Sequence, residues 1–451
     1  MVVDSGEPQA HPRDRLKREL RLTDATLLVV SGVIGSGIFL TPAAIAGLLP
    51  QPGLILAVWA VGGAISLAGA LANAELAAMF PRAGGDYVYL REAFHPLAGF
   101  LVGWLSFGVI YGGTIATLAA GFASALADLV PLGSAGQLAV AVALTVGISA
   151  LNYVGVRWGA RANNVTALLK LLGLLAFAGV GLAFGDGDAA RLGAPPAAVG
   201  DALTPVAFAL ALSPVFFSYL GWNSSVYVGS EIRDPARTLP RSLFLGIGIC
   251  TLVYLLTNLV YLYALPVAEL AEAPNAGEAA ARALFGGAGG TLIGAFVLLS
   301  ILGTLNATVL VGPRIAYAMA LDGLFFARVD HAHPSYRTPS VAIGLQAVMS
   351  IGILLVLRTF ERALDYTVFA ILLATMADIA ALYRLRRRQP ERRRPYRAWG
   401  YPWLPAVYFG ANAVVAAALL VGSPRDCAIG LAVAAAGLPF YWLFARRAAG
   451  A

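Results

Sequence analysis

Long apolar segments recur along almost the whole chain and constrain its fold more than any other feature. About 20 apolar residues cross the hydrocarbon core of a bilayer. Only 12% of the residues are charged, against about 25% in soluble domains. The sequence therefore predicts an all-α polytopic membrane protein with twelve transmembrane helices. The predicted spans are 25–47, 53–79, 97–127, 136–155, 163–184, 202–231, 241–265, 288–320, 340–358, 364–383, 402–421 and 427–445.

Positive charges are concentrated in every second loop between these spans. With a cytoplasmic N terminus, 25 of the 31 Lys and Arg residues fall in inner segments and five in outer loops, as the positive-inside rule requires. We therefore expect both termini in the cytoplasm, 1–24 as a cytoplasmic N-terminal segment, and a location in the plasma (inner) membrane. The net charge of +7 then reports topology rather than a nucleic-acid partner, and the basic run 384–397 is expected to face anionic membrane lipid.

Two of the predicted spans are interrupted. Span 1 carries Gly32, Gly35 and Gly37, and span 6 carries a polar, glycine-containing insert at 216–225. Glycine costs about 1 kcal/mol relative to alanine within a helix, and unpaired peptide groups in lipid are expensive. Such breaks therefore persist only where protein, water or a ligand satisfies the backbone, and broken helices in corresponding halves indicate an inverted-repeat transporter. The prediction is one transmembrane transporter domain, 25–447, with repeats at about 25–184 and 202–383 and extra helices at about 402–445.

The two breaks could bind oppositely charged groups of one ligand. Free amides at 35–37 would open the second half of span 1, and a helix N-terminus suits a carboxylate. Carbonyls of Val33, Phe217, Ser218 and Leu220 would lose their helical partners and could accept hydrogen bonds from an ammonium. An α-amino acid fits both ends, whereas the alternative is close helix packing through small residues. The candidate substrate-binding positions are Val33, Ile34, Gly35, Ser36, Gly37, Phe217, Ser218, Tyr219 and Leu220.

Lys170 is the only lysine besides Lys17, and it lies well inside span 5. A charge near the bilayer centre costs about 2.5–3.5 kcal/mol on insertion scales, so such a residue needs a partner or a function. The freed carbonyls of span 1 are candidate acceptors for its ammonium. The lysine then either replaces a coupling cation or exchanges a proton, and the alternative is that it snorkels to the inner face.

Other polar and aromatic side chains are candidates for lining the same site. Tyr111 and Thr114 belong to span 3, and Asn223 belongs to the insert in span 6. Tyr254 and Asn258 lie one turn apart in span 7 and would share a face of that helix. Each of these residues is also compatible with ordinary packing.

Signals for an enzyme are weak. The four histidines lie outside the apolar segments, and none has metal-ligand spacing to cysteine or carboxylate. The glycine pattern of span 1 follows no strand, so it is not a dinucleotide fingerprint, and no phosphate-loop motif occurs. We therefore expect no catalytic residue, no metal, no cofactor and no direct coupling to ATP.

Several motifs together resemble the amino acid–polyamine–organocation (APC) superfamily of transporters. Residues 34–42 resemble the family's span 1 signature, and 84–89 resemble its first cytoplasmic loop. The string 217–223, with Lys170 and the run 254–261, is similar to the L-type amino acid transporter (LAT) branch. The likeness extends over nearly the whole chain.

The resemblance implies a leucine-transporter-type fold with alternating access and sodium-independent exchange of neutral amino acids. It implies that 35–37 bind the substrate carboxylate, that carbonyls of Val33, Phe217 and Leu220 bind its amino group, and that Phe217 is a gate. Lys170 would stand in for a sodium ion, with Tyr254 as its functional neighbour.

The same resemblance bears on partners. Animal members pair with a glycoprotein through a cysteine in the loop between spans 3 and 4, and residues 127–137 contain no cysteine here. We therefore expect a member of the bacterial type, without a disulfide-linked heavy chain, that acts as a monomer on small neutral amino acids. The alternatives are a proton-coupled amino acid importer, an amino acid sensor on the same fold and, least favoured, a membrane enzyme.

Overall fold

The computed structural model describes residues 11–127, 129–193, 205–357 and 360–449. Residues 1–10 of the N-terminal segment, the predicted start of span 6 and of the second repeat at 202, and the predicted end of span 9 at 358 lie outside the described residues.

The described chain is helical, with two isolated β-bridges in place of a sheet. Nine of its helices are long and apolar enough to cross a membrane. The bent pair Leu22–Val33 and Gly37–Leu48 raises this number to ten if the pair counts as one span. Two shorter apolar helices lie at Val206–Tyr219 and Ser340–Val356. The continuous candidate spans are Pro52–Met79, Pro96–Ala127, Ser134–Tyr153, Val156–Phe184, Pro235–Ala264, Gly287–Leu321, Val368–Arg388, Trp403–Gly422 and Cys427–Arg446. The predicted total of twelve spans thus exceeds the number that meets this test.

The first predicted span is broken where its glycines lie. Helix α1 (Leu22–Val33) ends before residues 34–36, and α2 (Gly37–Leu48) begins after them at an angle of 46°. Ile34 adopts an extended conformation with ψ of 90°, which ends the helical hydrogen bonding.

The sixth predicted span, 202–231, departs from a simple broken helix. Helix α9 (Pro205–Tyr219) ends at the insert, and the chain continues in two 3₁₀ turns, η3 (Ser224–Tyr227) and η4 (Gly229–Glu231). The expected second half of this span is therefore not an α-helix. Side-chain contacts hold it instead, among them a hydrogen bond from the Ala83 amide to Ser230 Oγ at 2.8 Å.

The remaining helices follow the predicted spans with local changes. Span 3 is α5 (Pro96–Leu105), a π-helical turn η1 (Ser106–Tyr111) and α6 (Gly112–Ala127). Span 8 is α13 (Gly287–Val311) followed by α14 (Pro313–Leu321), since Pro313 begins a new helix. The others are α3 (Pro52–Met79), α7 (Ser134–Tyr153), α8 (Val156–Phe184), α10 (Pro235–Ala264), α15 (Ser340–Leu357), α16 (Phe360–Arg388), α17 (Trp403–Gly422) and α18 (Pro424–Ala449).

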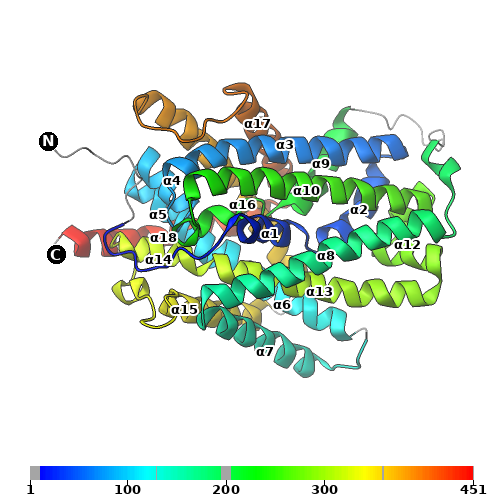
Figure 1. The fold of residues 1–451 in the computed structure, drawn as a ribbon, viewed down its shortest axis with the longest axis horizontal. Coiled ribbons are helices and arrows are strands. Elements are labelled where there is room, and N and C mark those ends of the chain that lie inside the picture. The colour runs from blue at the N-terminus through cyan, green and yellow to red at the C-terminus, as the bar shows by residue number, and fades with distance from the viewer. Residues whose placement is uncertain (1–10, 128, 194–204, 358–359, 450–451) are drawn as a thin grey trace.

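The helices form one elongated bundle around the broken segments (Figure 1). The broken helix α1 packs against α8, α10 and α13, and α2 packs against α9. Short helix α4 (Asp86–Ala93) and α14 lie at one end of the bundle, and α12 (Ala276–Phe285) lies at the other.

A buried ion pair fastens the end of the sixth segment. Arg314 of α14 donates to both carboxylate oxygens of Glu231, at 2.7 and 2.9 Å, and both side chains are fully buried. The amides of Glu19 and Leu20 in the N-terminal segment donate to the Glu231 carbonyl. This segment is thereby joined to the end of the broken span.

Candidate substrate site

The two broken segments pack directly against each other, and glycine makes this possible. A Cβ atom on Gly32 would lie 2.6 Å from Ser224 Oγ and 2.9 Å from the Gly221 carbonyl oxygen. A Cβ on Gly37 would lie 2.8 Å from Ser218 Oγ. Gly221 also has φ of +90°, a conformation that L side chains rarely adopt. The close approach therefore requires glycine on both segments.

Tyr254 of α10 joins the two breaks. Its hydroxyl lies 2.8 Å from the Val33 carbonyl oxygen and 2.9 Å from the Ser218 carbonyl oxygen. A hydroxyl has one proton to donate, so it serves the two carbonyls in turn. Each carbonyl oxygen keeps a second lone pair, which remains open to a ligand.

Lys170 of α8 is fully buried and contacts the first break. Its ammonium donates to the Ile34 carbonyl at 2.7 Å, to the Ser31 carbonyl at 3.2 Å and to Thr304 Oγ1 at 2.9 Å. These three acceptors match the three N–H donors of an ammonium. The side chain therefore lies inside the bundle, which excludes the snorkelling alternative.

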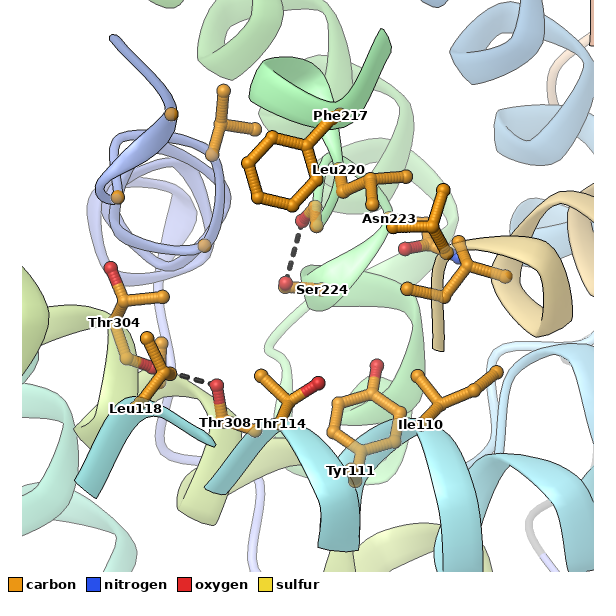
Figure 2. Close-up of a pocket in the computed structure, with 18 of the residues that line it drawn as sticks. Ile110, Tyr111, Thr114, Leu118, Phe217, Leu220, Asn223, Ser224, Thr304 and Thr308 are labelled. Carbon is orange, nitrogen blue, oxygen red and sulfur yellow. Dashed lines mark hydrogen bonds between the residues drawn. The ribbon is translucent and has the colours of Figure 1, made fainter. Parts of the chain in front are cut away.

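A cavity of about 160 Å³ opens where the breaks meet. Figure 2 shows Phe217 on one side of it, with Tyr111 and Thr114 from η1 and α6 across from it. Ten of the sequence-predicted residues line this cavity: Val33, Gly35, Ser36, Gly37, Tyr111, Thr114, Phe217, Ser218, Leu220 and Asn223.

Five predicted residues lie behind the lining instead. Lys170 and Tyr254 hold the broken backbone in the way described above. Ile34 contributes its carbonyl to Lys170. Tyr219 is buried against Trp59 and Tyr254 with ring centroids 6.2 and 5.2 Å away. Asn258 donates to the Tyr254 carbonyl within its own helix at 2.8 Å.

At both breaks, backbone groups beside the cavity remain available to bind a ligand. Within the part of the chain that the structure describes, no group accepts a hydrogen bond from the amides of Gly35, Ser36 or Gly37. The Phe217 carbonyl accepts only the Leu220 amide, at 3.2 Å, among the described residues. The site can therefore donate to an anionic group at the start of α2 and accept from a cationic group at the second break.

Sequence reasoning missed the contribution of α13. Thr304 and Thr308 line the cavity, and Ser300 Oγ lies 3.3 Å from the Ile34 and Gly35 carbonyls. These three hydroxyl residues recur every four positions in an apolar span, so they share one helix face. That spacing is the signal that would have found them.

Asp86 and Tyr227 were also missed as lining residues. Tyr227 follows the second break, and Asp86 begins α4, far away in the sequence. Nothing in their local sequence indicates that they meet, because the contact depends on the tertiary fold.

An apolar helical bundle with a cavity between two broken segments defines a multi-pass membrane protein with the architecture of a secondary transporter. The chain belongs to the amino acid permease family, whose model matches residues 20–438. Members of this family are transporters and not enzymes.

Curated relatives cover nearly the whole chain. It is 31% identical over 444 residues to the serine/threonine exchanger SteT of Bacillus subtilis, with 97% of this chain and 100% of the relative aligned. It is 30% identical to Asc-type amino acid transporter 1 of Homo sapiens, with 97% and 84% aligned. It is 32% identical to the large neutral amino acids transporter small subunit 2 of Mus musculus, with 95% and 81% aligned. The chain is thus similar to proteins of the L-type branch.

Proposed function

We propose that this protein is a sodium-independent exchanger of small neutral L-amino acids that works by alternating access in the plasma membrane. The proposal includes twelve spans with a 5+5 inverted repeat, both termini in the cytoplasm, and a monomer without a disulfide-linked heavy chain. The activity of the bacterial relative, serine/threonine exchange, supports exchange as the mode of transport.

The position of Lys170 is the observation that carries sodium independence. Its ammonium is bound by two carbonyls and a hydroxyl at the first break, which are oxygen ligands of the kind that a sodium ion takes. A lysine bound in this way supplies a positive charge at the break, so the site needs no sodium ion to stabilise it.

The lining of the cavity supports a small neutral substrate. Hydroxyl groups come from Ser36, Thr114, Ser224, Thr304 and Thr308, and the volume is about 160 Å³. Asp86 is the one charged side chain among the described residues of the lining. Such a cavity can hydrogen-bond a serine or threonine hydroxyl.

The proposed residue roles follow from the two ends of the site. The amides at 35–37 bind the substrate carboxylate, and carbonyls of Val33, Phe217 and Leu220 bind its ammonium. The Phe217 side chain, which lies beside the cavity (Figure 2), closes over the bound amino acid.

Counterflow in proteoliposomes tests this function. Vesicles loaded with unlabelled serine should accumulate labelled serine equally in sodium and in choline buffer, at the same pH on both sides. Empty vesicles should take up little. Uptake that ignores internal amino acid and follows a pH gradient would establish the proton-coupled importer, and uptake that requires sodium would remove the assigned role of Lys170.

A further inference from the structure

Two carboxyl groups that the substrate site does not use lie together beside the cavity. Asp86 of α4 and Asp378 of α16 are each 1% exposed, on two helices that pack together, and they lie close enough to interact electrostatically. Oδ1 of each aspartate is buried with no hydrogen-bond partner in the described structure. A proton on one of the two groups supplies a donor that these buried oxygens otherwise lack, since an ionised carboxylate has none.

The remaining contacts of the pair are neutral. Tyr227 donates to Asp86 Oδ2 at 2.5 Å, and Asn73 donates to Asp378 Oδ2 at 2.6 Å. The phenol groups of Tyr89 and Tyr408 lie near both carboxyl groups, and that of Tyr111 lies near Asp86. No Lys, Arg or His forms an ion pair with either aspartate among the described residues.

The neighbouring charges on the packed helices have partners of their own. Glu75 of α3 is bound by Arg386 and Arg394, and Arg91 of α4 is bound to Glu92 and Asp322. These arginines therefore already have carboxylate partners, and none of them compensates a second negative charge on the aspartate pair.

Two buried carboxylates without a cation cannot both be ionised at a reasonable cost, and one of them retains a proton. Burial raises the pKa of Asp86, and the hydrogen bond from Tyr227 offsets this only in part. In addition, the Tyr89 hydroxyl is buried with no hydrogen-bond partner in the described structure. This hydroxyl lies near both aspartates and can donate a further hydrogen bond without adding charge.

The pair is connected to the cavity. Asp86 lines the cavity itself, and Asn223, another lining residue, donates to the Tyr227 hydroxyl at 3.1 Å. Hydrogen bonds thus run from Asn223 through Tyr227 to Asp86, and the neighbouring Asp378 accepts one from Asn73 of α3. These contacts link the second break to α3, α4 and α16.

We propose that Asp86 and Asp378 form a one-proton binding site in the wall of the cavity, and that the shared proton holds α4, α16 and the second break together. The bound pair carries one negative charge. When the proton leaves, two adjacent carboxylates repel each other and the chain of hydrogen bonds separates. The effect on transport rests on the exchange function proposed above, whereas proton binding does not.

Infrared spectroscopy of the purified protein tests the site without any transport assay. At neutral pH the wild type should show the C=O stretch of one protonated carboxylic acid, and this band should be absent in Asp86→Asn and in Asp378→Asn. Glu278→Gln is the matched control, because Glu278 is an exposed carboxylate paired with Arg282, and it should retain the band. A wild-type spectrum without the band overturns the proposal, as does a band that both single variants retain.

The pH dependence of exchange gives a second, independent test. The pH is kept equal on both sides of the membrane and raised from about pH 6 to about pH 9. Above the apparent pKa of the pair, the rate of wild-type exchange should fall by up to about tenfold per pH unit, because the fraction of protein that holds the shared proton falls by that factor. Rates of Asp378→Asn, each normalised to its own value at low pH, should stay flat. Identical profiles in wild type and Asp378→Asn overturn the transport role, and a profile that responds to sodium instead of pH identifies a metal-ion site.

Discussion

The Lys170 ammonium lies 2.7 Å from the carbonyl oxygen of Ile34, at the point where α1 stops. The last carbonyls of a helix have no intrahelical partner, and in an apolar bundle they must be satisfied by another group. Lys170 satisfies two of them, with Thr304 completing its own hydrogen bonds. One side chain therefore stabilises the break and places a positive charge beside the substrate cavity.

Replacing Lys170 with alanine should abolish exchange and destabilise the protein. The Ser31 and Ile34 carbonyls would lose their charged donor and keep only the hydroxyls of Thr304 and Ser300, and a hydrogen bond to a charged group is worth about 1.5–3 kcal/mol. Lys17→Ala is the matched control, because the Lys17 side chain is 65% exposed and its ion pair is worth about 0–1 kcal/mol. Thermal unfolding and counterflow measure both effects. Unchanged exchange rates and apparent affinities on both faces in Lys170→Ala would show that the assigned role is wrong.

Tyr254→Phe should slow exchange and lower the melting temperature, because it removes the donor shared by Val33 and Ser218. The expected loss is about 1–3 kcal/mol. Tyr261→Phe offers a close control: Tyr261 lies on the same helix and is fully buried, but its hydroxyl has no hydrogen-bond partner in the described structure. Equal effects of the two substitutions would mean that the link between the breaks contributes nothing.

Gly32→Ala should disrupt the contact between the breaks. The added Cβ would meet the Gly221 backbone oxygen at 2.9 Å, and overpacking of this kind costs about 1–3 kcal/mol. Gly47→Ala in α2 has open space around the new Cβ, so it should be neutral or slightly stabilising by up to about 1 kcal/mol. The comparison is made by thermal unfolding and counterflow, and a Gly32→Ala protein as stable and active as Gly47→Ala would refute the packing argument.

Phe217→Ala should weaken the closure of the site. Without the ring, the bound amino acid stays open to one side, so we expect a higher KM and leakage of internal substrate that is not exchanged for external substrate. Phe217→Leu, which keeps an apolar side chain at this position, should behave closer to wild type. Efflux into amino-acid-free buffer measures the leak, and tight coupling with normal turnover in Phe217→Ala would remove Phe217 as the gate.

The sequence located the breaks because their signals are local. Bare backbone at Gly35 and Gly37 cannot be an ordinary lipid-facing helix, and a lone buried lysine must have polar partners. These arguments placed ten residues at the cavity and brought Lys170 to the first break.

Long-range contacts were beyond the same reasoning. The sequence predicts that span 6 continues past its insert to residue 231, yet Tyr227, Ser230 and Glu231 each bind a residue on a distant segment, and these contacts override helix formation. The juxtaposition of Asp86 with Asp378 likewise depends on how α4 packs against α16, which no local pattern encodes.

Calorimetric titration of the purified protein in sodium-free buffer tests the central claim, that the two breaks bind the opposite charges of one amino acid. The ligands are L-alanine, L-alanine amide, which lacks the carboxylate, and propionate, which lacks the ammonium. The account predicts binding of L-alanine without sodium and, for each analogue, affinity that is weaker by at least about tenfold, or 1.4 kcal/mol. Equal binding of either analogue, or binding of L-alanine only when sodium is added, would contradict it.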